Sequence, residues 1–155
     1  IAQCLVGSEM CIRDRSDTGQ KQVPWDTITC LIVDDDKFSR TFAKTALYQI
    51  GIKNIKEVGS ADEAREMVGA SKIDVILLDQ QMPQKSGLDF ARELKNNPHD
   101  ELKNIPIIMI TVDTKEKTVL EAKILGIQEY LVKPISPLAL KKRICSALGI
   151  KQERV

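Results

Sequence analysis

One ten-residue stretch constrains the fold of this chain more than any other. Between Asp74 and Pro83, an apolar run from Val75 to Leu78 ends on the carboxylate of Asp79. A short apolar run that is rich in branched side chains and bounded by turn residues is typical of a strand buried on both faces. A carboxylate at the carboxyl end of such a strand lies where open α/β sheets bind their ligands. Asp79 is therefore a candidate site residue, although this stretch alone is equally compatible with a simple turn cap.

The residues around this stretch alternate between strand and helix patterns. The predicted strands are 28–33, 54–58, 75–79, 105–111 and 128–132. A predicted helix follows each strand. The first helix has Phe38, Phe42, Ala46 and Ile50 on its core face and ends at Gly51, and the second is opened by Ser60 and Glu63. The third covers 87–95, the fourth covers 114–125 and is opened by Asp113 and Glu116, and the fifth covers 136–149 and is opened by Ser136 and Pro137. This alternation predicts an α/β fold with a parallel sheet and helices on both faces.

The number and polarity of the strands favour one arrangement of the sheet. A doubly wound sheet of five parallel strands commonly has the order 2-1-3-4-5, as in the flavodoxin-like three-layer sandwich. The second strand, 54–58, is the most polar and is expected at an edge. The binding crevice of such a sheet lies between its first and third strands.

Composition limits the classes of protein to consider. The 155 residues suit a single domain, and the formal net charge of +1 gives no general attraction to nucleic acid or membrane. No apolar run approaches the roughly 20 residues of a spanning helix. Cys4, Cys11, Cys30 and Cys145 lack metal-binding spacing, and the last two are predicted to be buried free thiols of a cytoplasmic protein.

The N-terminal segment has a different character from the rest. Residues 4–15 resemble the in-frame translation of a sequencing-library transposon adapter, so 1–15 are interpreted as non-native. A signal peptide is disfavoured because charged residues interrupt its apolar part. Residues 16–26 are expected to be a flexible lead-in, 27–150 the domain and 151–155 a tail. The chain is interpreted either as a stand-alone domain or as a fragment that lost an upstream partner at the non-native junction.

Several polar residues are expected to meet at one rim of the predicted sheet. Asp34 and Asp35 end the first strand, Asp79 the third, Thr111 the fourth and Lys133 the fifth. Because the strands are parallel, these ends share one edge of the sheet. Clustered carboxylates suit Mg²⁺, and a carboxylate beside a hydroxyl and an ammonium group can accept a phosphoryl group. Asp79, on the central strand, is the expected nucleophile.

These motifs together resemble a response-regulator receiver domain. The resemblance rests on Leu31 to Asp36, on Leu77 to Pro83 with Gly87, on Ile110-Thr111, and on Tyr130 to Pro134, and it covers about residues 27–150. It implies that Asp79 is the phosphoacceptor, that Mg²⁺ is bound by Asp34, Asp35, Asp79 and the backbone carbonyl of Gln81, and that Thr111 and Lys133 bind the phosphoryl group. It further implies a switch through Thr111 and Tyr130, and a cis Lys133–Pro134 bond.

The resemblance also implies partners. The phosphoryl donor would be a histidine kinase or a phosphotransfer protein. The face formed by 114–125, 128–132 and 136–149 would bind a downstream protein or form a homodimer on phosphorylation. No motif for binding nucleic acid or membrane is present.

The residues are also compatible with two other functions. Asp34-Asp35-Asp36 after a strand also fits the nucleophile motif of haloacid-dehalogenase phosphatases, with Asp34 as nucleophile. That interpretation is weakened by the lack of a second acidic pair late in the chain and of a cap domain. The third possibility is a degenerate receiver that serves only as a docking module.

Overall fold

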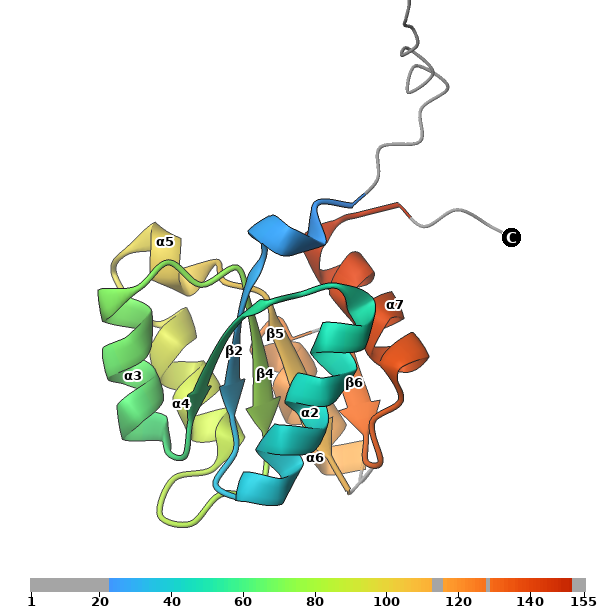
Figure 1. The fold of residues 1–155 in the computed structure, drawn as a ribbon. Coiled ribbons are helices and arrows are strands. Elements are labelled where there is room, and N and C mark those ends of the chain that lie inside the picture. Colours follow the sequence, from blue (N-terminus) through green and yellow to red (C-terminus); the bar gives the residue numbers. More distant parts are fainter. Residues whose placement is uncertain (1–22, 113–115, 128, 152–155) are drawn as a thin grey trace, which may run out of the picture.

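A computed structural model describes residues 23–112, 116–127 and 129–151. Several predictions lie outside these residues. They concern segment 1–15 with Cys4 and Cys11, most of the lead-in, the capping residue Asp113 and most of the tail. The described part of the lead-in is a short 3-10 turn, η2 (Trp25–Thr27). Trp25 packs against one of the two core clusters. The turn η2, blue in Figure 1, lies at the amino ends of the strands.

The elements follow the predicted alternation, with small changes at their ends. They are β2 (Thr29–Val33), α2 (Lys37–Ile50), β3 (Asn54–Val58), α3 (Ala61–Ala70), β4 (Val75–Asp79), α4 (Gly87–Lys95), α5 (Asp100–Lys103), β5 (Ile107–Thr111), α6 (Glu116–Ile124), β6 (Glu129–Val132) and α7 (Pro137–Leu148). The short helix α5 was missed, because one turn of helix carries too little periodic pattern to be detected in a polar segment.

All neighbouring strands are parallel, and the sheet has the order β3-β2-β4-β5-β6. This is the predicted order 2-1-3-4-5, with the polar second strand at an edge. In Figure 1 the strands run downward, with α2 and α7 on the near face and α3, α4 and α6 on the other side. The chain is therefore a doubly wound, three-layer α/β sandwich, and the carboxyl ends of all strands share one edge.

The central position of β4 explains its apolar sequence. Every residue of β4 is buried. Ile76 and Leu78 pack in the core cluster with α3 and α4, whereas Val75 and Leu77 pack in the cluster with α2 and α7. Side chains alternate between the faces of a strand, so a strand with a core on each side needs apolar residues at every position.

Polar side chains begin several of the helices, at Ser60 and Ser136 as predicted. Asp36, Ser60 and Ser136 each accept a hydrogen bond from the backbone three residues ahead. Ser86 does the same for α4 and forms a reciprocal capping box with Asp89. Such caps satisfy backbone donors that the first helical turn leaves unpaired. They fix the start of α2 and α4 just after the strands that carry the candidate site.

One prediction about the core was wrong. Phe38 and Phe42 are 85% and 56% exposed, and the buried face of α2 is formed by Ala43, Ala46 and Leu47. Phe38 and Phe42 lie beside the connection between β6 and α7, together with Pro134 and Ile135. The side of α2 that carries these two residues thus borders this connection instead of the sheet, while Ala43 packs in the core.

The remaining sequence predictions about the backbone and the thiols agree with the structure. The Lys133–Pro134 peptide bond is cis. Cys30 and Cys145 are buried free thiols, and burial raises the pKa of Cys30. Within 23–112, 116–127 and 129–151, every helix is too short or too polar to cross a membrane.

Candidate functional site

Asp34 and Asp35 lie in the short connection between β2 and α2. Asp34 is 5% exposed, and its side chain accepts a hydrogen bond from the Asp36 backbone N–H at 2.9 Å. Asp36 faces the helix instead, because its carboxylate caps α2 by accepting from the Ser39 N–H at 3.0 Å. The connection therefore separates the three acids, with the third used for folding and the first two available at the site.

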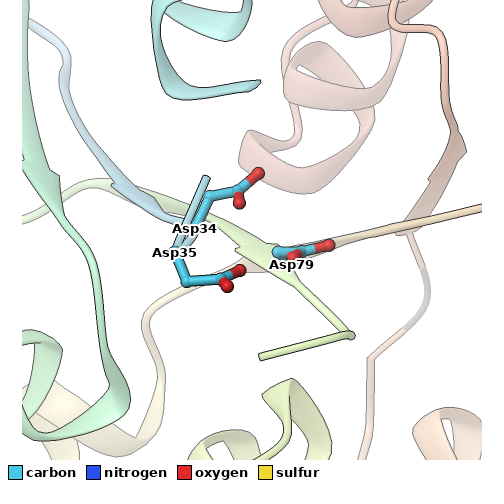
Figure 2. A group of neighbouring side chains, drawn as sticks. All are labelled: Asp34, Asp35 and Asp79. Atoms are coloured by element: carbon cyan, nitrogen blue, oxygen red, sulfur yellow. The ribbon is translucent and has the colours of Figure 1, made fainter. Parts of the chain in front are cut away.

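Asp79 lies beside these two acids at the end of β4. The pairing of Val33 with Leu78 in the sheet brings the end of β2 next to the end of β4. Asp34, Asp35 and Asp79 each offer a carboxylate oxygen, and these oxygens lie within 4.8 Å of one another (Figure 2). Three carboxylates from two separate strands thus converge, as the strand order predicts, at a spacing that one small cation can bridge.

Lys133 reaches the same cluster from the loop after β6. Its Nζ lies 3.3 Å from Asp34 Oδ2 and 3.3 Å from Asp79 Oδ1. Burial lowers the pKa of Lys133, but the attraction of Asp79 and Asp34 outweighs burial and raises the pKa overall. The lysine therefore remains a cation beside both carboxylates.

The electrostatic balance of the cluster leaves an excess of negative charge. Burial, followed by repulsion from Asp34, raises the pKa of Asp79 to about 6. Lys133 and a hydrogen bond from the Gln81 backbone N–H oppose this rise without cancelling it. Desolvation and like charges both disfavour an ionised carboxyl group, so one lysine is not enough to satisfy this site.

The other predicted residues lie on neighbouring elements. Thr111 ends β5, is 3% exposed, and pairs in the sheet with Val132. The Lys133 backbone N–H donates to the Thr111 carbonyl at 2.9 Å, which ties the two predicted phosphoryl-binding residues together. The Tyr130 hydroxyl lies 3.0 Å from the carbonyl oxygens of Val119 and Ile127, so its hydrogen can be donated to α6.

Sequence reasoning missed two residues around the site. Ser39 Oγ lies 3.4 Å from Lys133 Nζ and also donates to the Asp36 carboxylate at 2.9 Å. The Gln80 side chain accepts from the Leu88 N–H at 3.0 Å and links the end of β4 to α4. For Ser39, the available signal was its position three residues after a helix cap, which brings it back toward the strand end.

These features define a class of protein: a doubly wound α/β domain with a cluster of three acids, two of them buried, and one lysine at the carboxyl ends of its strands. The chain matches the family model of the response regulator receiver domain over residues 30–145. It is 32% identical to the chemotaxis protein CheY-3 of Vibrio cholerae over 114 residues, which are 74% of this chain and 86% of the relative. The chain belongs to the response regulator receiver domain family.

Solved structures agree with this assignment. The chemotaxis protein CheY4 of Vibrio cholerae superimposes with a TM-score of 0.72 at 28% identity, covering 78% of this chain and 98% of that protein. The receiver domain of the sensor histidine kinase PA1611 from Pseudomonas aeruginosa PAO1, solved with a magnesium ion coordinated in its active-site cleft, has a TM-score of 0.70 at 22% identity over 79% of this chain and 98% of its own. At 22% identity, the similarity to this receiver domain shows a shared fold.

Proposed function

We propose that this chain accepts a phosphoryl group on Asp79 and thereby changes a protein-interaction surface. One observation carries the proposal: Asp79 is 5% exposed yet shares its site with Asp34, Asp35 and Lys133. Folding alone gives no reason to bury repelling carboxylates, because an apolar residue there would cost less. Membership of the receiver family supports the same function.

The proposed transfer can be written at the level of atoms. A carboxylate oxygen of Asp79 attacks the phosphorus atom of a phosphohistidine and forms an oxygen–phosphorus bond. The phosphorus–nitrogen bond breaks, and the imidazole nitrogen keeps the electron pair and takes a proton from solvent. Lys133 would pair with one phosphoryl oxygen, and the Thr111 hydroxyl would donate to another. The chain itself is modified and returns by hydrolysis, so it is a signalling phosphoacceptor that assists its own reactions and not a conventional enzyme.

The donor atoms at this site fit Mg²⁺. Carboxylate oxygens are its preferred protein ligands, and the excess negative charge that raises the pKa of Asp79 favours a cation. Asp34, Asp35, Asp79 and the carbonyl of Gln81 are the proposed ligands. When bound, Mg²⁺ would neutralise charge on these acids and on the incoming phosphoryl group. The magnesium in the cleft of the PA1611 receiver domain supports this part of the proposal.

Phosphorylation would change the surface formed by α6, β6 and α7. An aspartyl phosphate adds about two negative charges and several acceptor oxygens, which would draw the Thr111 hydroxyl inward and free space for Tyr130. On this surface Leu120, Ile124 and Val132 are 56%, 77% and 47% exposed. Apolar groups of this kind support contact with a downstream protein or with a second copy of the chain.

One experiment separates this function from the alternatives. Wild type, Asp79→Asn and Asp34→Asn are treated with acetyl phosphate and Mg²⁺, and the modified residue is mapped by mass spectrometry. We expect modification of wild type at Asp79, none in Asp79→Asn, and a much slower reaction in Asp34→Asn. Modification at Asp34 with turnover of phosphate esters would indicate a phosphatase, and no Mg²⁺-dependent modification would indicate a docking module.

A second feature favours a docking place for the protein that donates the phosphoryl group. Phe38 and Phe42 line a pocket of about 260 Å³ that they share with Lys133, Pro134 and Ile135. Lys133 also contacts Asp79, so one side chain of this largely apolar pocket borders the proposed acceptor site. A histidine-bearing partner that reaches Asp79 would cover the pocket, and burial of a phenylalanine contributes about 1.5–3 kcal/mol.

Replacement of Phe38 by alanine is therefore expected to affect a protein donor and not a small one. The protein donor is the phosphohistidine domain that transfers fastest to wild type in a panel of purified domains. The rate of transfer from this donor to Phe38→Ala should be at least about 10-fold lower than to wild type, the equivalent of about 1.4 kcal/mol. Modification by acetyl phosphate should stay within about two-fold of wild type, since Phe38 is 85% exposed and outside the core.

Ile124→Ala is the matched control for this prediction. It removes another exposed apolar side chain, 77% exposed, from the opposite candidate surface on α6. We expect normal transfer from both donors. Equal losses in Phe38→Ala and Ile124→Ala, or an equal loss with acetyl phosphate, would rule out the pocket as the donor's docking place.

A further inference from the structure

Arg40, a residue without a predicted role, touches the backbone that carries two of the site acids. It lies in the second turn of α2, and its Nη1 donates a hydrogen bond to the Asp34 carbonyl oxygen at 2.7 Å. Its side chain is 21% exposed. A partly buried hydrogen bond from a charged donor is stronger than a neutral one, so this contact can fix the peptide it reaches.

The peptide in question joins Asp34 to Asp35. The Asp34 N–H donates to Val58 at 3.2 Å, and its carboxylate is held by the Asp36 N–H and by Lys133. Arg40 adds a contact to the Asp34 carbonyl, which lies beyond the end of β2. The orientation of this carbonyl fixes the plane of the Asp34–Asp35 peptide, and that plane, together with the φ angle of Asp35, limits where the Asp35 side chain can lie.

The guanidinium group is itself held from the edge of the sheet. Arg40 Nε lies 3.7 Å from a carboxylate oxygen of Glu57 on β3. Lys44, one helical turn further along α2, pairs with the same carboxylate at 2.8 Å. Arg40 therefore links three elements, β3, α2 and the connection after β2, whereas the ion pair of Lys44 links α2 to β3.

We infer that Arg40 is a positioning residue that holds the Asp34–Asp35 peptide in the orientation needed for cation binding. The inference rests on the proposed function of the acidic cluster. The positive charge of Arg40 has the opposite effect on cation binding, because a positive charge near a cation site weakens binding by repulsion. Removal of Arg40 thus distinguishes the two effects, because lost positioning weakens Mg²⁺ binding and lost repulsion strengthens it.

The first test measures Mg²⁺ affinity by isothermal titration calorimetry. We expect Arg40→Met to bind Mg²⁺ about 10-fold more weakly than wild type, the usual effect of removing a residue that orients metal ligands. Arg40→Lys, which keeps one charged donor, should recover part of the loss. Lys44→Met removes the same charge from the same carboxylate partner and should stay within about two-fold of wild type. Unchanged or tighter binding by Arg40→Met would overturn the inference.

The second test uses metal-free protein and does not depend on Mg²⁺. The Asp36 N–H donates to the Asp34 carboxylate, whereas the Ile76 N–H donates to Pro106 in the sheet. In Arg40→Met we expect amide hydrogen exchange at Asp36 to accelerate by about 10-fold while exchange at Ile76 stays unchanged. A general loss of stability would accelerate both, and no change at Asp36 would overturn the inference.

The two tests distinguish a failure of the proposed metal site from a failure of the proposed role of Arg40. If wild type binds no Mg²⁺, the proposed metal site is wrong, and the exchange of Asp36 still reports whether Arg40 holds the connection. If wild type binds Mg²⁺ and Arg40→Met binds it equally well, the metal site stands and the role of Arg40 falls.

Discussion

Replacement of Gly87 by alanine is expected to lower the free energy of unfolding by about 2–4 kcal/mol, because the new methyl group has no room. A Cβ at this position would lie 2.4 Å from the Asp79 carbonyl oxygen and 3.0 Å from Gln80 Cα. Both neighbours are backbone atoms of the strand end that carries the proposed phosphoacceptor. Relief of the clash requires α4 and the end of β4 to move apart, so Mg²⁺ binding should weaken as well.

Gly69→Ala is a sharp control for this prediction. Gly69 is an exposed position in α3, and among the described residues no atom beyond its chain neighbours and its own helical backbone lies within 4 Å of the position that a Cβ would take. Alanine favours helix over glycine, so this variant should be more stable than wild type by about 0.5–1 kcal/mol. Urea unfolding followed by circular dichroism measures both changes. If Gly87→Ala were as stable as wild type, the close approach of α4 to β4 would be wrong.

Much of the site could be predicted because it depends on few geometric facts. Parallel strands must end at one edge, so residues after the apolar runs have to meet there. The contact between Lys133 and Asp34 joins residues 99 positions apart, and it followed from strand order alone. Apolar runs and capping residues marked where the strands end, and that was sufficient to bring Asp34, Asp79, Thr111 and Lys133 together.

The predictions failed where the helical period allowed more than one buried face. Phe38 and Phe42 share a helical face with the buried Ala46, yet the buried stripe of α2 runs through Ala43, Ala46 and Leu47. Ala43 is 2% exposed and its neighbour Phe42 is 56% exposed, so the two phenylalanines lie to one side of that stripe. Arg40 escaped notice for a different reason: its partner is a backbone carbonyl, and no residue type in the sequence marks such an acceptor.

Asp79→Asn is expected to make the metal-free protein more stable at pH 7.5 by about 1–3 kcal/mol, although it removes the proposed phosphoacceptor. Burial and the nearby Asp34 raise the pKa of Asp79 to about 6, above the value of about 4 expected in the unfolded chain. The folded protein therefore holds the proton more tightly than the unfolded chain. Its stability should fall as the pH rises from about 4 to about 6 and stay lower above that range.

The asparagine variant lacks this titration, so its advantage should be present at pH 7.5 and absent near pH 4. Glu66→Gln removes the same charge from an exposed position on α3 and should change stability little at either pH. The measurement is urea unfolding in EDTA at both pH values. A variant less stable than wild type at pH 7.5 would mean that Lys133 compensates the buried carboxylates more fully than the pKa of Asp79 implies.

Addition of Mg²⁺ should reverse this order. A ligand that binds only the folded state stabilises it in proportion to the logarithm of its concentration above the dissociation constant. The measurement uses about 10 mM Mg²⁺, a concentration suited to a weak carboxylate site. Wild type, which keeps all three carboxylates, should gain more free energy of unfolding from the added Mg²⁺ than Asp79→Asn. If both results are obtained, the carboxylates at the strand ends lower stability in the metal-free protein and favour cation binding, since the same repulsion would cause both.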